Sequence, residues 1–241
     1  MIPVPTRIRL WSGRFILLAA WLALHLTASA IDWPDKHELA AEASSPDGHY
    51  GILAPTMDAP EVDEMTNYLV DAKAHKVLAK LTKSHYQIGA NRQGVQAAWS
   101  PDSRRCVLQF ESRFGFYSVV VLELNGDNVE QYEVGSLMKL VLGQALEGKK
   151  EEIGTASAVS KFGPGGQVIF RAVGDNDPKR MDEKSKGAIL QGVFDTHQSK
   201  WASISARVAD MKTVDSILPA LEPVKTDWEN YTAEARACSE L

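Results

Sequence analysis

Acidic side chains gather in one short stretch of the chain, where they could bind a hard cation. The stretch contains Asp58, Glu61, Asp63 and Glu64. Ca²⁺ takes oxygen ligands of this kind, but exposed carboxylates are also the norm in solvated loops. We therefore expect a solvated loop and no metal site.

A second acidic stretch begins like a calcium-binding loop. It starts at Asp175-Asn176-Asp177, but Lys179 occupies the next ligand position of the EF-hand pattern, and the glycine that this pattern requires is absent. The pattern is therefore not that of an EF-hand.

Recognised catalytic motifs are absent from the sequence. It contains no G-x-S-x-G turn, no H-E-x-x-H, no P-loop and no glycine-rich dinucleotide turn. The histidines lack metal-ligand spacing, although strand order would bring His49, His75 and His197 to one end of the expected sheets. We expect neither a metal nor a cofactor.

Three turns of similar layout divide the chain into units. They are Ser45-Pro46-Asp47-Gly48, Ser100-Pro101-Asp102-Ser103 and Gly163-Pro164-Gly165-Gly166, and a short apolar run follows each. Their prolines lie 55 and 63 residues apart, a spacing typical of repeat architectures. Proline presets φ in such turns, and Ser and Asp bond nearby backbone groups.

Each unit contains four strand candidates rich in Val, Ile, Tyr and Phe. We expect strands at 39–43, 50–54, 67–71 and 76–81, then 95–99, 105–110, 117–124 and 129–134, then 156–160, 167–172, 188–194 and 200–207. The expected fold is mainly β, with three consecutive four-stranded antiparallel meanders that resemble propeller blades in an incomplete or open ring. The residues expected to be buried are Trp99, Leu108, Phe110, Val119, Val121, Ile169 and Phe170.

Peripheral helices are expected at two places. Leu137, Leu140, Val141 and Ala145 recur at helical spacing, which predicts a helical insertion near 136–148 within a β domain at 31–208. A capping box at Thr226 predicts a helical extension over 209–241.

The first thirty residues have the layout of a signal peptide. Arg7, Arg9 and Arg14 precede an apolar run over 15–26, and Ala28-Ser29-Ala30 matches a cleavage site. We expect an exported protein, periplasmic or extracellular, with no stable membrane span after cleavage. Removal of the three arginines changes the formal net charge from −5 to −8, which disfavours a nucleic-acid partner.

Two cysteines remain after such a cleavage. Cys106 alternates with Leu108 and Phe110 on one strand face, as a small buried hydrophobe would. Cys238 lies in the expected terminal helix, and the sequence leaves open whether the two form a disulfide.

Residues Ala98-Trp99-Ser100-Pro101-Asp102-Ser103 resemble the Trp-Ser-Pro-Asp-Gly signature of TolB-like β-propellers. The segments 44–50 and 162–166 are similar to the same signature. The resemblance implies that each unit is a four-stranded meander whose first two strands are joined by this turn, and that the protein binds a protein or peptide. Propellers have at least about four blades, so three units imply an open stack, a further unit after residue 208, or an oligomer that completes the ring.

Meander order places all the longer connections at the end of the sheets opposite the short turns. They are expected at 55–66, 82–94, 111–116, 135–155 and 173–187. Binding residues tend to lie on such loops, and Arg and aromatic side chains are enriched in recognition surfaces. The predicted contact residues are Arg92, Arg113 and Phe114, with Tyr86 and Phe116, although both phenylalanines could instead pack between units.

We therefore interpret the chain as an exported binding module. Two alternatives remain open at this point. One is a hydrolase or lyase whose carboxylates converge at the long-loop end, from the acidic run and from residues 175–183. The other is a structural subunit of a cell-envelope assembly.

Overall fold

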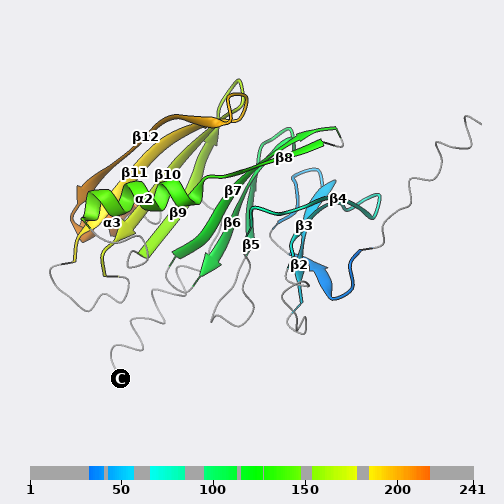
Figure 1. The fold of residues 1–241 in the computed structure, drawn as a ribbon, viewed down its shortest axis with the longest axis horizontal. Coiled ribbons are helices and arrows are strands. Elements are labelled where there is room, and N and C mark those ends of the chain that lie inside the picture. Colours follow the sequence, from blue (N-terminus) through cyan, green and yellow to red (C-terminus); the bar gives the residue numbers. More distant parts are fainter. Residues whose placement is uncertain are drawn as a thin grey trace, which may run out of the picture.

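The computed structural model describes residues 33–40, 43–56, 66–84, 95–112, 115–126, 128–147, 154–177 and 185–217. Within these residues the fold is mainly β, and three consecutive antiparallel meanders of four strands carry two helices (Figure 1). The expected fold class is confirmed.

The first meander is a separate four-stranded sheet. Its strands are β1 (His37–Leu39), β2 (Tyr50–Pro55), β3 (Tyr68–Asp71) and β4 (Lys76–Lys80). The prediction of the first strand at 39–43 is wrong in position. The strand ends at Leu39 because the Ala43 N–H donates to the Ala40 carbonyl oxygen at 3.0 Å, which closes a turn.

The second and third meanders join into one eight-stranded sheet. The second contains β5 (Val95–Trp99), β6 (Arg105–Ser112), β7 (Gly115–Asn125) and β8 (Asn128–Glu133). The third contains β9 (Gly154–Phe162), β10 (Gln167–Asp175), β11 (Gly187–Asp195) and β12 (Lys200–Ala209). The two are joined where β7 and β9 run parallel, with Gly115 paired to Thr155.

Helix α2 (Gly135–Leu146) follows β8 in the chain and lies across the third meander. Its buried residues Met138, Leu142 and Leu146 share a hydrophobic core with β7, β10 and β11 (Figure 1). Glu147 adopts a left-handed φ of 53° at its C-cap. Helix α3 (Met211–Ile217) packs on the other side of the third meander.

Alternating side chains on the second meander enter two different cores. Cys106, Leu108 and Phe110 face the first meander, where they meet Ile52 and Leu69. Residues on the opposite face enter the core that contains α2. The side chains expected to be buried are at most 1% exposed at Leu108, Phe110, Val119, Val121 and Phe170, whereas Trp99 and Ile169 are half-buried.

The strand order places the short turns at one end of the sheets and the other connections at the opposite end (Figure 1). One of the expected long connections is wrong. Strands β6 and β7 continue until Ser112 pairs with Gly115, so the two strands occupy most of the expected loop over 111–116 and leave only residues 113 and 114 between them. A register shift between Phe110 and Glu111 leaves one residue of β7 unpaired, so Phe116 enters the same core as Val119 and Val121.

Candidate functional site

The first two Ser-Pro-Asp turns close with the same hydrogen bonds. The Ser45 hydroxyl donates to the Asp47 carboxylate at 2.6 Å, and the Ser100 hydroxyl donates to Asp102 at 2.5 Å. In both turns this hydroxyl also accepts the backbone N–H five residues later. The serine hydroxyls, followed by backbone N–H donors, hold the pKa of both aspartates below the usual 3.8.

The turns that join the third and fourth strands of the first and third meanders also match each other. Asp71 and Asp195 each accept the backbone N–H three residues later, at 2.8 and 3.1 Å. The residue after that donor has a positive φ in both turns, 51° at His75 and 53° at Ser199. The carboxylates of this end are therefore used to close turns.

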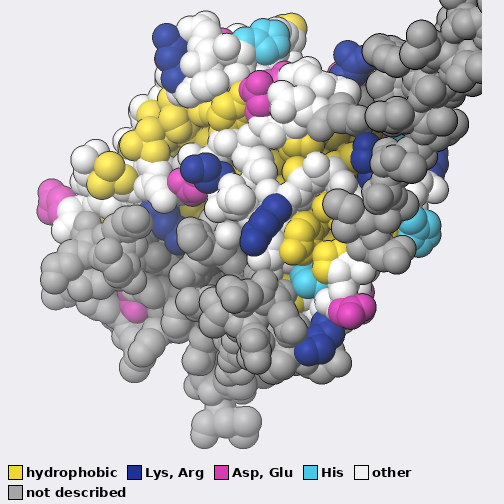
Figure 2. All heavy atoms as spheres, turned by 45° about the vertical axis from the view of Figure 1, so that its right-hand side comes forward, with side chains coloured by type: hydrophobic (Ala, Val, Ile, Leu, Met, Phe, Trp, Pro, Cys, Tyr) yellow, Lys and Arg dark blue, Asp and Glu magenta, His cyan; other side chains and the backbone are white. Residues whose placement is uncertain are grey.

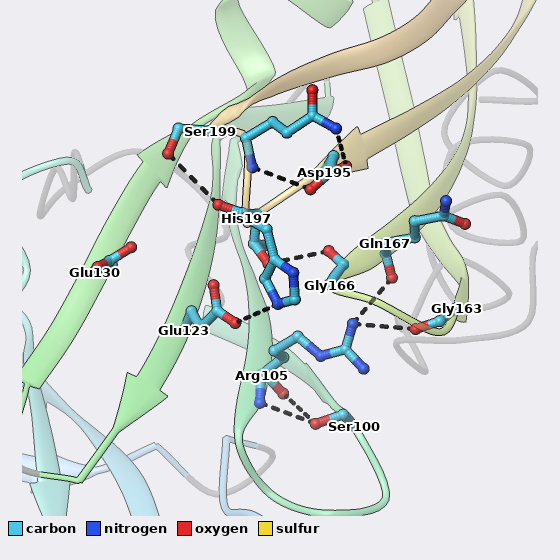
Figure 3. A network of polar contacts seen from close by, with 12 residues as sticks. Ser100, Arg105, Glu123, Glu130, Gly163, Gly166, Gln167, Asp195, His197 and Ser199 are labelled. Atoms are coloured by element: carbon cyan, nitrogen blue, oxygen red, sulfur yellow. Dashed lines mark hydrogen bonds and ion pairs between the residues drawn. The ribbon is translucent and has the colours of Figure 1, made fainter.

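The third Pro-containing turn differs, because an arginine of the second meander binds its backbone. Arg105 donates through Nη1 to the carbonyl oxygens of Gly163 and Gln167, both at 3.2 Å (Figure 3). The guanidinium carbon also lies 5.6 Å from the centre of the Phe162 ring. Arg105 thus links the second meander to the third.

Four further polar side chains lie near Arg105 at the contact between the two meanders: Glu123, Glu130, Tyr132 and His197. We call this contact the seam, and Figure 3 labels Arg105, Glu123, Glu130 and His197. The acids Glu123 and Glu130 lie directly opposite each other on β7 and β8, an arrangement that is destabilising unless partners offset it. His197 Nε2 lies 3.8 Å from Glu123, and the Tyr132 hydroxyl donates to Glu130. The Tyr132 hydroxyl also lies 3.2 Å from the carbonyl oxygen of Thr196.

The chemistry available at the seam is that of hydrogen-bond donors. Burial, and then the hydrogen bond to Glu130, raises the pKa of Tyr132 above its usual 10.0, so the phenol keeps its proton at neutral pH. Within the described ranges, no group of three or more His, Cys, Asp or Glu could hold a metal ion. The polar side chains of the seam contact one another or backbone carbonyl oxygens.

The three histidines of the short-turn end do not converge. His49 lies 2.9 Å from Asp71, in the first meander. His75 stacks on Trp33 with ring centres 4.6 Å apart. His197 belongs to the seam between the second and third meanders. Each histidine therefore has a different partner.

The residues predicted to contact a partner come mostly from the opposite end. Phe116 is 1% exposed, lies in the core shared with α2, and has the Lys139 ammonium 5.1 Å from its ring centre. It therefore packs in the core in this structure and presents no surface to a partner. The following lie outside the described residues: Tyr86, Arg92, Arg113, Phe114 and the acidic run 58–64.

The acidic stretch after β10 forms hydrogen bonds at the base of a connection. Asp175 accepts the Asp177 N–H at 3.0 Å, and the Asn176 side chain accepts the Lys186 N–H at 2.8 Å. The Ser185 hydroxyl donates to Asp177 at 3.0 Å. These side chains tie together the two ends of the β10–β11 connection.

Cys106 is a free, fully buried thiol in the core between the first and second meanders. Burial raises its pKa well above the usual 9.0, so the thiol is protonated and unreactive. Cys238 lies outside the described residues.

The sequence patterns did not predict the seam. Arg105 donates to carbonyl oxygens of residues 58 and 62 positions away in the sequence, and the Tyr132 hydroxyl lies near a carbonyl oxygen 64 positions away. The available signal was that Arg105, Glu123 and Glu130 lie on neighbouring strands with hairpin register, which places them in one row.

Comparison of the chain with family models, curated proteins and solved structures gives no match. Among the described residues, no helix is long and apolar enough to cross a membrane. On the face in Figure 2, hydrophobic side chains gather in two areas, with basic and acidic side chains between them.

Proposed function

We propose that this protein is an exported binding module with no recognisable catalytic motif, and that it recognises a protein or peptide through its long-loop end. The observation that supports this most directly is the difference between the two ends of the sheets. The short-turn end is closed by its own hydrogen bonds, whereas the other end carries the connections whose sequences contain Tyr86, Arg92, Arg113 and Phe114.

The short-turn end is a poor candidate for the recognition surface. Its carboxylates accept backbone N–H groups of their own turns, its arginine donates to carbonyl oxygens of the neighbouring meander, and its tyrosine donates to Glu130. A partner would have to replace these intramolecular bonds, so little net binding energy would remain.

Export is part of the proposal and rests on residues 1–30. The basic start, the apolar run and the Ala-Ser-Ala site together have the layout of a cleaved signal peptide. A TolB-like relationship is likewise proposed. It is supported by the matched hydrogen bonds of the Ser45 and Ser100 turns, each joining the first two strands of a four-stranded meander.

A display selection tests the binding function. The protein from Ile31 onward is used to select from a random peptide library, and the selected peptides are re-tested on two variants. The first replaces Arg92, Arg113 and Phe114 with alanine, and the second is the control His75→Ala. We expect peptides that lose binding to the triple variant and keep binding to the control. A selection that yields no specific peptide, or peptides that the triple variant binds equally well, would contradict the proposal.

A further inference from the structure

The outer face of the third meander is a surface that the proposed function does not use. Strands β10–β12 turn Val168, Phe170 and Leu190 toward the core that contains α2. The alternate side chains point to the opposite side of the sheet. Helix α3 covers one end of that side, where its Val214 packs with Val173 and Ile189.

The remainder of this side, which we call the outer face, is polar. It consists of Ile169, Arg171, Gln191, Val193, Ser203, Ser205 and Arg207. The side chains of Gln191, Ser203, Ser205 and Arg207 are exposed, and those of Ile169, Arg171 and Val193 are half-buried. Such a surface offers hydrogen-bond donors around a small apolar centre.

The two arginines of the outer face are held in a defined relation by the strand register. Arg171 pairs with Gln191, which pairs with Ser205, so these three form one row across the sheet. Arg207 lies in the next row, opposite Ile189. Two strand spacings and two residue rises put the two arginine Cα atoms about 12 Å apart.

Neither arginine has a hydrogen-bond or ion-pair partner within the described part of the chain. Nε of Arg171 is buried without a hydrogen bond, which is costly for a donor on a charged group. The nearby acids at the ends of β11 and β12 are already engaged, since Asp195 bonds to Gln198 and Asp210 caps α3 through Thr213. The outer face is thus basic on a chain whose formal net charge is −5.

We propose that the outer face binds an acidic, extended peptide segment of a partner protein. Carboxylates of the peptide pair with Arg171 and Arg207, and Gln191, Ser203 and Ser205 bond to its backbone. An extended chain rises about 3.3 Å per residue, so the two carboxylates should be three to four residues apart in the peptide. A nucleic acid does not fit, because two arginines on an acidic chain offset few phosphates.

The probes are two synthetic fluorescent peptides that differ only in charge. One carries Glu at intervals of four residues among Ser and Thr, and the other carries Gln at those positions. Fluorescence anisotropy at low salt is measured with the wild-type protein and with Arg171→Gln, Arg207→Gln and the control Arg104→Gln. Arg104 is an exposed arginine at the short-turn end.

We expect the wild-type protein to bind the Glu peptide and not the Gln peptide. Each outer-face substitution should weaken binding about threefold to fivefold, as for a partly exposed ion pair, and Arg104→Gln should leave it unchanged. Arg207 is exposed, so its substitution tests the site even if Arg171→Gln fails to fold. Equal binding by all variants, equal losses with Arg104→Gln, or no binding of the Glu peptide would overturn the inference. The variant with alanine at residues 92, 113 and 114 should still bind this peptide, which separates the outcome from that of the proposed function.

Discussion

Arg105 and Gly163 join two meanders that are adjacent in the sequence but separated by a helix. Nη1 of Arg105 lies 3.2 Å from the carbonyl oxygen of Gly163, at the end of the sheets where the short turns meet. Met138 and Leu142 of α2 enter the hydrophobic core to which both meanders contribute. The seam and the helix together fix how the second and third meanders are positioned.

Replacing Arg105 with alanine should lower the free energy of unfolding by about 1–3 kcal/mol, because two carbonyl oxygens lose a charged donor. Urea denaturation measures this loss. Arg104→Ala is the matched control, since Arg104 is the exposed neighbour in the same turn, and its cost should stay within about 0.5 kcal/mol. Equal losses in both variants would mean that the Arg105 contacts do not stabilise the seam.

Gly165 and Gly166 provide a matched pair of substitutions in the third turn. Both have positive φ, 62° and 82°, so alanine should cost about 1–2 kcal/mol at either position through backbone strain. A Cβ at Gly165 meets no atom within 4 Å, whereas a Cβ at Gly166 would lie 2.6 Å from Oγ1 of Thr196. Gly166→Ala should therefore have the lower melting temperature of the two. The reverse order would contradict the placement of this turn against the β11–β12 turn.

The core between the first and second meanders should depend on Phe110. The side chain is 1% exposed, and Phe110→Ala should cost about 3–5 kcal/mol in urea denaturation. Val208→Ala is a suitable comparison, because Val208 is 52% exposed and its truncation should change stability by about 0.5 kcal/mol or less. A loss below about 1 kcal/mol at Phe110 would mean that the two sheets do not pack as described.

Asp102 should contribute stability that disappears in acid. The Ser100 hydroxyl and the Arg104 N–H lower the pKa of the folded carboxyl below its ordinary 3.8, although burial opposes them. A carboxyl whose pKa is lower in the folded than in the unfolded state stabilises the protein at pH values above the unfolded-state pKa. This stabilisation is lost as the pH falls through the folded-state pKa. Asp102→Asn should thus be less stable than the wild type at pH 7, and the difference should shrink below about pH 4. A difference that is constant from pH 7 to pH 3 would refute the role of this charge.

Local sequence signals predicted the strands well. The errors occur where contacts between residues far apart in the sequence determine where a strand begins or ends. Alternation and turn residues located β5 at Val95–Trp99 and the start of β6 at Arg105. The first strand was misplaced because the turn at Ala40–Ala43 depends on how the segment packs against the second meander, where Ala43 is fully buried. The continuation of β6 and β7 as far as the Ser112–Gly115 pair was not predicted, because the sequence between these residues, Arg113-Phe114, is not a strong two-residue turn signal.

The polar contacts between meanders could not be predicted in the same way. The Arg105 contacts require knowledge of which meanders pack together and at which end. The buried position of Phe116 depends likewise on α2, whose Lys139 covers its ring. Sequence patterns define the face of a strand, but the partner of that face is set by the tertiary packing.

The most direct test of recognition through the long-loop end is to locate a bound peptide on the protein. A photoreactive amino acid is placed at position 92 in one variant and at position 75 in another, each is irradiated with a peptide from the display selection, and mass spectrometry identifies the cross-linked products. We expect an efficient cross-link from position 92 that excess unlabelled peptide abolishes, and only background from position 75. A competed cross-link from position 75, with none from position 92, would contradict recognition through the long-loop end.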